Sequence, residues 1–113
     1  MSVAIFGHED FAPVDDSKDF QYIPVSGEAT FNSVWEVAIA KLGITRLANG
    51  IYLKQEELAG ILEDFRKIKE WVLENNNLLN HDREYVVEHI DFVLEELPKR
   101  WAECPNAKTL WMG

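Results

Sequence analysis

The chain has 113 residues, of which 47% are hydrophobic and 12% aromatic, which is enough apolar material for one domain with a buried core. Twenty acidic residues outnumber eleven basic ones, so the formal net charge is −9. A charge of this sign repels nucleic-acid phosphates and anionic lipid, which argues against direct binding to either and favours a basic protein as partner.

The N-terminus and the cysteine content indicate the compartment. Residues 1–7 contain no basic side chain and too short an apolar run for a signal peptide, and no segment has the length and hydropathy of a membrane span. Cys104 is the single cysteine, so an internal disulfide is excluded. We therefore expect a cytoplasmic protein that does not enter the membrane.

Two short strands are expected near the N-terminus, at residues 3–6 and 20–25, because both segments are rich in apolar, aromatic or β-branched side chains. Pro24 cannot donate a ladder hydrogen bond, so the second strand is expected at a sheet edge. Residues 7–19 between them predict a long solvated connection with Pro13 as its turn residue. This connection contains Glu9, Asp10, Asp15, Asp16 and Asp19.

Helical periodicity then predicts a first helix from about Thr30, with Gly43 as its C-terminal stop. The apolar face of this helix consists of Phe31, Val34, Trp35, Ala38, Ile39 and Leu42. Residues 44–50 are expected to form a connector that contains the turn signal Asn49-Gly50. Residues 51–53 are expected to be either a short strand or an extended link.

Two longer amphipathic helices are predicted in the second half of the chain. One spans about residues 55–75, and Gly60 either weakens it by about 1 kcal/mol relative to alanine or permits close packing. The asparagines at 75–77 and 80 are expected to end this helix and to cap the next. The last helix begins near His81, and Pro98 is expected to kink or restart it. Residues 109–112 form either a final strand or a docking tail.

The most informative feature is a row of carboxylates on the last predicted helix. Glu84, Glu88, Asp91 and Glu95 stand at i, i+4, i+7 and i+11, opposite the apolar face. Like charges at neighbouring helical positions cost about 0.2–0.5 kcal/mol per pair, so the row works slightly against its own helix. The helix dipole favours acidic residues only in the first turn, and the last three carboxylates lie beyond it.

Comparison of the two long helices sharpens this point. The helix at 55–75 mixes its charges, with Glu63 or Asp64 able to meet Lys67, and Arg66 able to meet Glu70. The last helix offers similar compensation only where Glu95 reaches Lys99. The carboxylate row is therefore interpreted as a binding surface for a basic partner, with an ordinary solvated face as the equally open alternative.

The tryptophans give a second, weaker indication of binding, because tryptophan is enriched in interface hot spots. Trp35 lies on the apolar face of its helix and is expected in the core, and Trp71 is expected at a rim. Trp101 and Trp111 fall in the less regular C-terminal part, where partner contact and internal packing are equally open.

The chemistry-bearing residues do not form a recognisable catalytic or metal pattern. His81, Tyr85 and His89 repeat every four residues, but a zinc site needs two further ligands. Cys104 has no histidine at a characteristic spacing, and no nucleophile elbow or phosphate-binding glycine loop occurs. We therefore expect no enzyme activity, no metal and no cofactor, with a pocket near Tyr85 and His89 as the enzymatic alternative.

In layout, the chain resembles the small acidic immunity proteins of bacterial polymorphic-toxin and contact-dependent inhibition systems. The resemblance covers about two-thirds of the chain. It comprises the N-terminal strand pair, the sequence Phe-Asn-Ser-Val-Trp at 31–35, the sequence Asn-Gly-Ile-Tyr-Leu at 49–53, and the charged helix through 57–71. It involves no diagnostic motif and transfers no functional residue. It implies a non-enzymatic inhibitor that binds a toxin domain, often a basic nuclease, and blocks its active site or substrate groove.

The sequence thus predicts a single domain, residues 1–113, of α+β fold with three main amphipathic helices packed on a small antiparallel sheet. The function expected is that of an immunity protein for a basic toxin domain, and the alternative is an acidic regulatory or adaptor module. The partner-binding residues expected are Glu84, Glu88, Asp91, Glu95, the five acids of residues 9–19, Trp101 and Trp111. The oligomeric state stays open.

Overall fold

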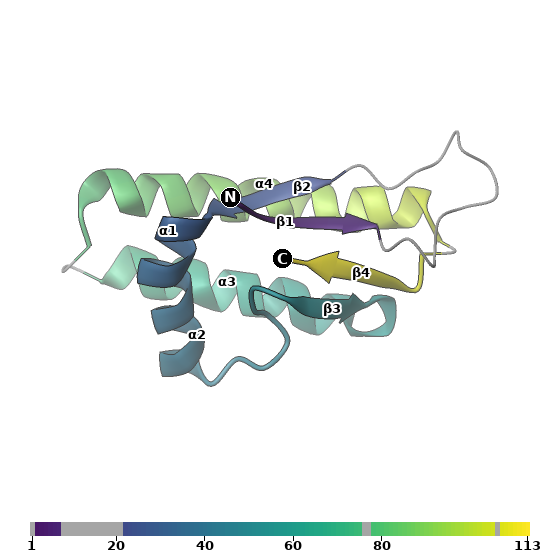
Figure 1. Ribbon diagram of the computed structural model, residues 1–113, viewed down its shortest axis with the longest axis horizontal. Helices are drawn as coiled ribbons and strands as arrows, with labels where there is room; N and C mark the ends of the chain where they lie inside the picture. Colours follow the sequence, from purple (N-terminus) through teal and green to yellow (C-terminus); the bar gives the residue numbers. More distant parts are fainter. Residues whose placement is uncertain (1, 8–21, 76–77, 106) are drawn as a thin grey trace.

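Four short strands form one antiparallel sheet in the order β2-β1-β4-β3 in the computed structural model, which describes residues 2–7, 22–75, 78–105 and 107–113. The strands are β1 (Ser2–Gly7), β2 (Ile23–Gly27), β3 (Ile51–Lys54) and β4 (Thr109–Met112). The two ends of the chain meet at the centre of the sheet (Figure 1), where Ala4 and Gly113 exchange backbone hydrogen bonds of 3.2 and 3.0 Å. Residues 51–53 and 109–112, for which the sequence left two alternatives open, both lie in strands of this sheet.

The second strand is displaced from its predicted position. It was expected at residues 20–25, whereas β2 spans Ile23–Gly27; residues 20 and 21 lie outside the described part of the chain. The register with β1 shifts between Val3 and Ala4, so the pairing contains an irregularity of the bulge type. β2 is an edge strand of the sheet, as Pro24 predicts.

The first helical run extends over residues 28–42 and begins two residues before the predicted start. It comprises α1 (Glu28–Thr30), a π-helical turn (Phe31–Trp35) and α2 (Glu36–Leu42). Within the π turn the rings of Phe31 and Trp35 are stacked at 5.7 Å between centroids, and both side chains are buried. Gly43 ends the run in the left-handed conformation with φ 66°, as expected from glycine's freedom there.

Two long helices form an antiparallel hairpin behind the sheet (Figure 1). A 3₁₀ turn (Gln55–Glu57) leads into α3 (Leu58–Glu74), and α4 spans Asn80–Glu103. Pro98 lies inside α4, so of the two expected outcomes, a kink or a restart, the restart does not occur. Leu97 and Trp101 on either side of it are both buried, and this packing offsets the backbone hydrogen bond that proline removes.

The expected end of the first long helix at an asparagine is confirmed, because Asn75 is the C-cap of α3, whereas the expected asparagine cap of the next helix is wrong. Leu79 occupies the N-cap position of α4 without a side-chain cap, and Asn80 is already the first helical residue. Arg83 reaches back from α4 and donates hydrogen bonds to the carbonyl oxygens of Val72 at 3.3 Å and Asn75 at 2.6 Å. The same carbonyls also accept the backbone N–H groups of Asn75 and Leu78, each at 3.3 Å, so Arg83 adds a charged donor to the turn that ends α3.

The core lies between the sheet and the helix pair. Alternate residues of each strand are buried on this side, among them Val3, Ile5, Leu53, Leu110 and Met112. The helices contribute the buried face predicted from their periodicity, which includes Ile61, Phe65, Ile68, Val86, Ile90 and Val93. The α+β class, with three main amphipathic helical segments on a small antiparallel sheet, is thereby confirmed. No described helix combines the length and hydropathy needed to cross a membrane.

Candidate protein-binding face

The carboxylate row of α4 lies on the side of the helix that faces away from the core. Glu84, Glu88, Asp91 and Glu95 are all exposed. The opposite side of α4 is buried through Val86, Ile90, Val93, Leu97 and Trp101. The helical periodicity that buries these apolar residues therefore also gathers the acidic side chains on one surface.

Asp91 differs from the other members of the row because it has a cationic partner on the neighbouring helix. Lys69 Nζ of α3 lies 2.6 Å from Asp91 Oδ1. Spacing rules within one helix cannot reveal this contact, since the two residues are 22 positions apart. Lys69 thus neutralises one carboxylate of the row at the seam between the two helices.

The expected compensation of Glu95 by Lys99 is replaced by a different pairing. Lys99 Nζ lies 3.9 Å from Glu96 Oε2, and Arg100 Nε lies 3.0 Å from Glu96 Oε1. Both cations of this turn therefore go to Glu96, which is half-buried. Within the described parts of the chain, Glu84, Glu88 and Glu95 have no ion-pair partner, and we refer to these three as the unpaired carboxylates.

An exposed aromatic side chain borders the unpaired carboxylates. Phe92 is 40% exposed and stands four residues after Glu88 and three before Glu95, which places it beside both on the helix surface. Its ring lies under the guanidinium of Arg100, with 5.5 Å between Cζ and the ring centroid. Phe92 thus adds an apolar contact to an acidic surface, whereas the aromatic contacts expected from the sequence were Trp101 and Trp111.

Tyr85 attaches α4 to the sheet. The backbone N–H of Gly27, at the end of β2, donates to the Tyr85 hydroxyl at 3.0 Å. His89 Nδ1 lies 2.8 Å from the Tyr85 carbonyl oxygen, so this nitrogen is the donor, and the two rings are 4.3 Å apart. The Tyr85 hydroxyl thus joins α4 to β2, while His89 Nδ1 bonds within its own helix. The described residues contain no cluster of three or more His, Cys, Asp or Glu side chains that could hold a metal ion.

The two C-terminal tryptophans have different environments. Trp101 is 1% exposed, and its indole N–H donates to the carbonyl oxygen of Ala107, so it is a core residue and its predicted partner contact is wrong. Trp111 is half-buried and packs edge-on against Tyr52, with 4.9 Å between ring centroids. Trp111 belongs to β4 in the sheet, so it is not part of the outer side of α4.

The remaining predicted binding residues are Glu9, Asp10, Asp15, Asp16 and Asp19, and they lie outside the described residues. The candidate face therefore consists of the unpaired carboxylates, Asp91 with its partner Lys69, and Phe92. Comparison of the chain with protein families, with curated proteins and with solved structures gives no match.

Proposed function

We propose that this protein is a non-catalytic immunity protein that binds a basic toxin domain, such as a nuclease, through the outer face of α4. The observation that carries the proposal is the set of unpaired carboxylates beside an exposed aromatic ring. Glu84, Glu88 and Glu95 supply negative charge without an ion-pair partner among the described residues, and Phe92 supplies apolar surface at the same place.

The local electrostatics favour a partner-binding surface over a helix face that contacts only water. Three carboxylates on one helix face repel one another, and the stabilisation that a neighbouring cation could provide is given to Asp91 and Glu96 instead. A basic partner would remove this repulsion on association. Complementary charges would also increase the association rate and disfavour partners of the same sign.

The proposed mechanism of inhibition is occlusion. A nuclease presents lysine and arginine side chains to the phosphates of its substrate, and a row of carboxylates offers these cations the same charge in place of phosphate. Phe92 would contribute desolvated contact at the centre of the interface, where aromatic side chains provide much of the affinity. The body of the inhibitor would then keep nucleic acid out of the substrate groove of the nuclease.

Co-expression with the toxic domain encoded next to this chain tests the proposal. We expect the wild-type chain to bind this domain and protect the cell, and the triple variant E84Q/E88Q/E95Q to lose much of both. A matched control, E56Q/E70Q/E74Q, removes three exposed acids from α3 and the turn before it, and should protect like the wild type. Equal protection by both triple variants would exclude the α4 face, and failure of the wild-type chain to bind would refute the function.

A further inference from the structure

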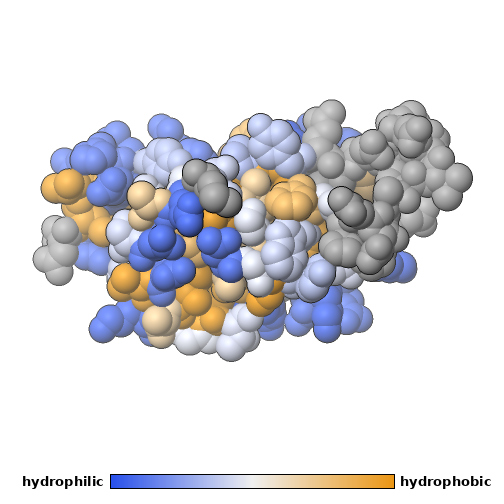
Figure 2. Space-filling view, in the orientation of Figure 1, coloured by the Kyte–Doolittle hydropathy of each residue, from blue (hydrophilic) through white to orange (hydrophobic). Residues whose placement is uncertain are grey.

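A small cavity opens at the end of the first helical run, where the chain turns from α2 into the connector of residues 44–50. Its volume is about 330 Å³, which is the size of a small ligand pocket. Its walls are mainly apolar and comprise Phe31, Ile39, Ala40, Ile44 and Ala48. In Figure 2 the helical run shows both kinds of surface, with apolar orange next to strongly hydrophilic blue. The cavity therefore has room for one long side chain with an apolar stem.

One carboxylate borders this apolar cavity. Glu36 stands four residues before Ala40 and seven before Gly43, so the three lie on one side of the helical run and line the cavity together. Glu36 is exposed, and it has no ion-pair partner among the residues that the structure describes. The rim of the cavity thus carries a negative charge that is open to a ligand.

The position of the cavity at the end of a helix adds to this negative potential. Gly43 and Ile44, which follow the last residue of α2, both line it. The last carbonyl groups give the C-terminal end of a helix a partial negative charge, which favours a cation. Arg46, the cation of the connector, is held at 3.1 Å from Asp64 of α3. The cavity therefore combines apolar walls with two sources of negative charge.

We propose that this cavity binds an arginine side chain of a basic protein partner, and we call it the arginine pocket. The stem of arginine packs on apolar surface, while its planar guanidinium group pairs with a carboxylate. The guanidinium is more weakly hydrated than the ammonium group of lysine, so it loses less on entering a half-open apolar cavity. Thr45 and Asn49 also line the pocket and provide oxygen acceptors for the remaining N–H groups.

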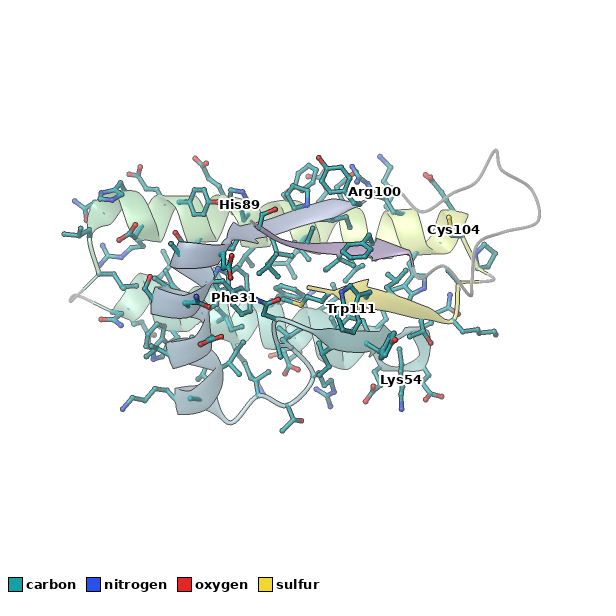
Figure 3. All side chains as sticks on the ribbon, viewed as in Figure 1. Phe31, Lys54, His89, Arg100, Cys104 and Trp111 are labelled. Carbon is teal, nitrogen blue, oxygen red and sulfur yellow. The ribbon has the colours of Figure 1, made fainter. Side chains whose placement is uncertain are left out.

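The arginine pocket is separate from the candidate face on α4. In Figure 3 its wall residue Phe31 lies on the helical run, whereas His89 lies on α4. The helical run follows the end of β2 at Gly27, and residues 8–21 precede the other end of this strand, at Ile23. The inference does not depend on the proposed function, because it can be tested with peptides and without a toxin domain.

Titration of the full chain with three blocked tripeptides, followed by NMR, tests the inference. The peptides carry arginine, lysine or citrulline between two glycines, and citrulline is a neutral side chain of the same shape as arginine. We expect the arginine peptide to shift the amide signals of Gly43 and Ala48 with a dissociation constant on the order of 1 mM. The citrulline peptide should bind at least about tenfold more weakly, because Glu36 then has no cation to pair with. The lysine peptide should also bind more weakly than the arginine peptide.

Two variants test the walls and the rim of the pocket. Glu36→Gln removes the charge and should weaken binding of the arginine peptide by about five- to tenfold. Ala40→Leu places a larger side chain in the cavity and should abolish binding. Ala40 is exposed, so this variant should stay folded, which circular dichroism verifies. Glu28→Gln is the matched control, because Glu28 is exposed on the same helical run without lining the cavity, and it should bind like the wild type.

The proposal would be overturned by the absence of signal shifts with the arginine peptide, or by equal binding of the citrulline or lysine peptide. Unchanged binding in Glu36→Gln, or an equal loss in Glu28→Gln, would likewise exclude the rim carboxylate as the recognition group. Free arginine provides the last comparison, since stronger binding of the free amino acid than of the arginine peptide would overturn the assignment of the pocket to a protein partner.

Discussion

The guanidinium group of Arg46 lies directly against Gly60 of α3, so close that a Cβ atom on Gly60 would be 2.7 Å from Arg46 Cζ. From this position Arg46 Nη1 contacts Asp64 Oδ2 at 3.1 Å, and Arg46 Nε lies 3.7 Å from Glu57 Oε2. Among the described residues, Asp64 is the buried residue that carries a charge, with 4% exposure. The contact fixes the connector of residues 44–50 to α3, and Gly60 provides the space for it.

Gly60→Ala should destabilise the protein, although the same change in an ordinary helix stabilises by up to about 1 kcal/mol. The added methyl group displaces Arg46 and leaves the buried Asp64 carboxylate without its partner. Loss of a fully buried pair costs about 3–5 kcal/mol, but Arg46 is partly exposed, so we expect about 1–2 kcal/mol and a net destabilisation of about 1 kcal/mol. Urea unfolding measures this difference.

Arg46→Met provides the control for this interpretation. With the guanidinium gone, Gly60→Ala meets no cation and should show the ordinary stabilisation of about 0.5–1 kcal/mol. The sign of the Gly60→Ala effect thus reverses between the two backgrounds. A destabilisation of equal size in both would show that the backbone of Gly60, and not the position of Arg46, determines the effect.

Arg83→Met should lower the free energy of unfolding by about 1–2 kcal/mol, because the carbonyl oxygens of Val72 and Asn75 at the end of α3 lose a charged donor. Methionine retains most of the apolar stem, so the change isolates the hydrogen bonds. Arg66→Met is the control, since Arg66 is exposed and pairs with Glu63 across one turn, and it should change stability by less than about 0.5 kcal/mol. Comparable losses in the two variants would argue against the capping role of Arg83.

The local elements of this fold could be predicted from the sequence, whereas its long-range contacts could not. Periodicity predicted the buried faces of the three helical segments. Gly43 ends its helix and Pro24 lies in an edge strand, as expected from their backbone chemistry. The contacts of Lys69 with Asp91 and of Arg46 with Asp64 join residues 22 and 18 positions apart, and no spacing rule specifies such pairs. The burial of Trp101 could not be predicted for the same reason, because it depends on the path of the chain through Ala107 to β4.

Tyr85→Phe should remove the hydrogen bond that joins the end of β2 to α4. The Gly27 N–H loses its acceptor, and because the bond is exposed to solvent we expect a loss of only about 0.5–1 kcal/mol. Hydrogen exchange is the sharper measurement, since the Gly27 amide should exchange faster while amides in the centre of α3 do not change. Tyr22→Phe removes a hydroxyl from a more exposed tyrosine and should leave the Gly27 amide as it is. Unchanged Gly27 exchange in Tyr85→Phe would contradict the contact.

Lys69→Met separates the charge of the candidate face from its shape. Lys69 neutralises Asp91, so the variant frees the Asp91 carboxylate as a fourth unpaired charge on this face. The association rate with a basic toxin domain should therefore increase several-fold at low salt. The exposed pair contributes at most about 1 kcal/mol to folding, so the variant should remain folded. Lys67→Met makes the same chemical change on α3 at an exposed site, and a general effect of net charge would accelerate binding equally in both. Greater acceleration by Lys69→Met would therefore identify the seam at Asp91 as part of the interface, whereas equal rates would indicate that steering comes from the whole chain.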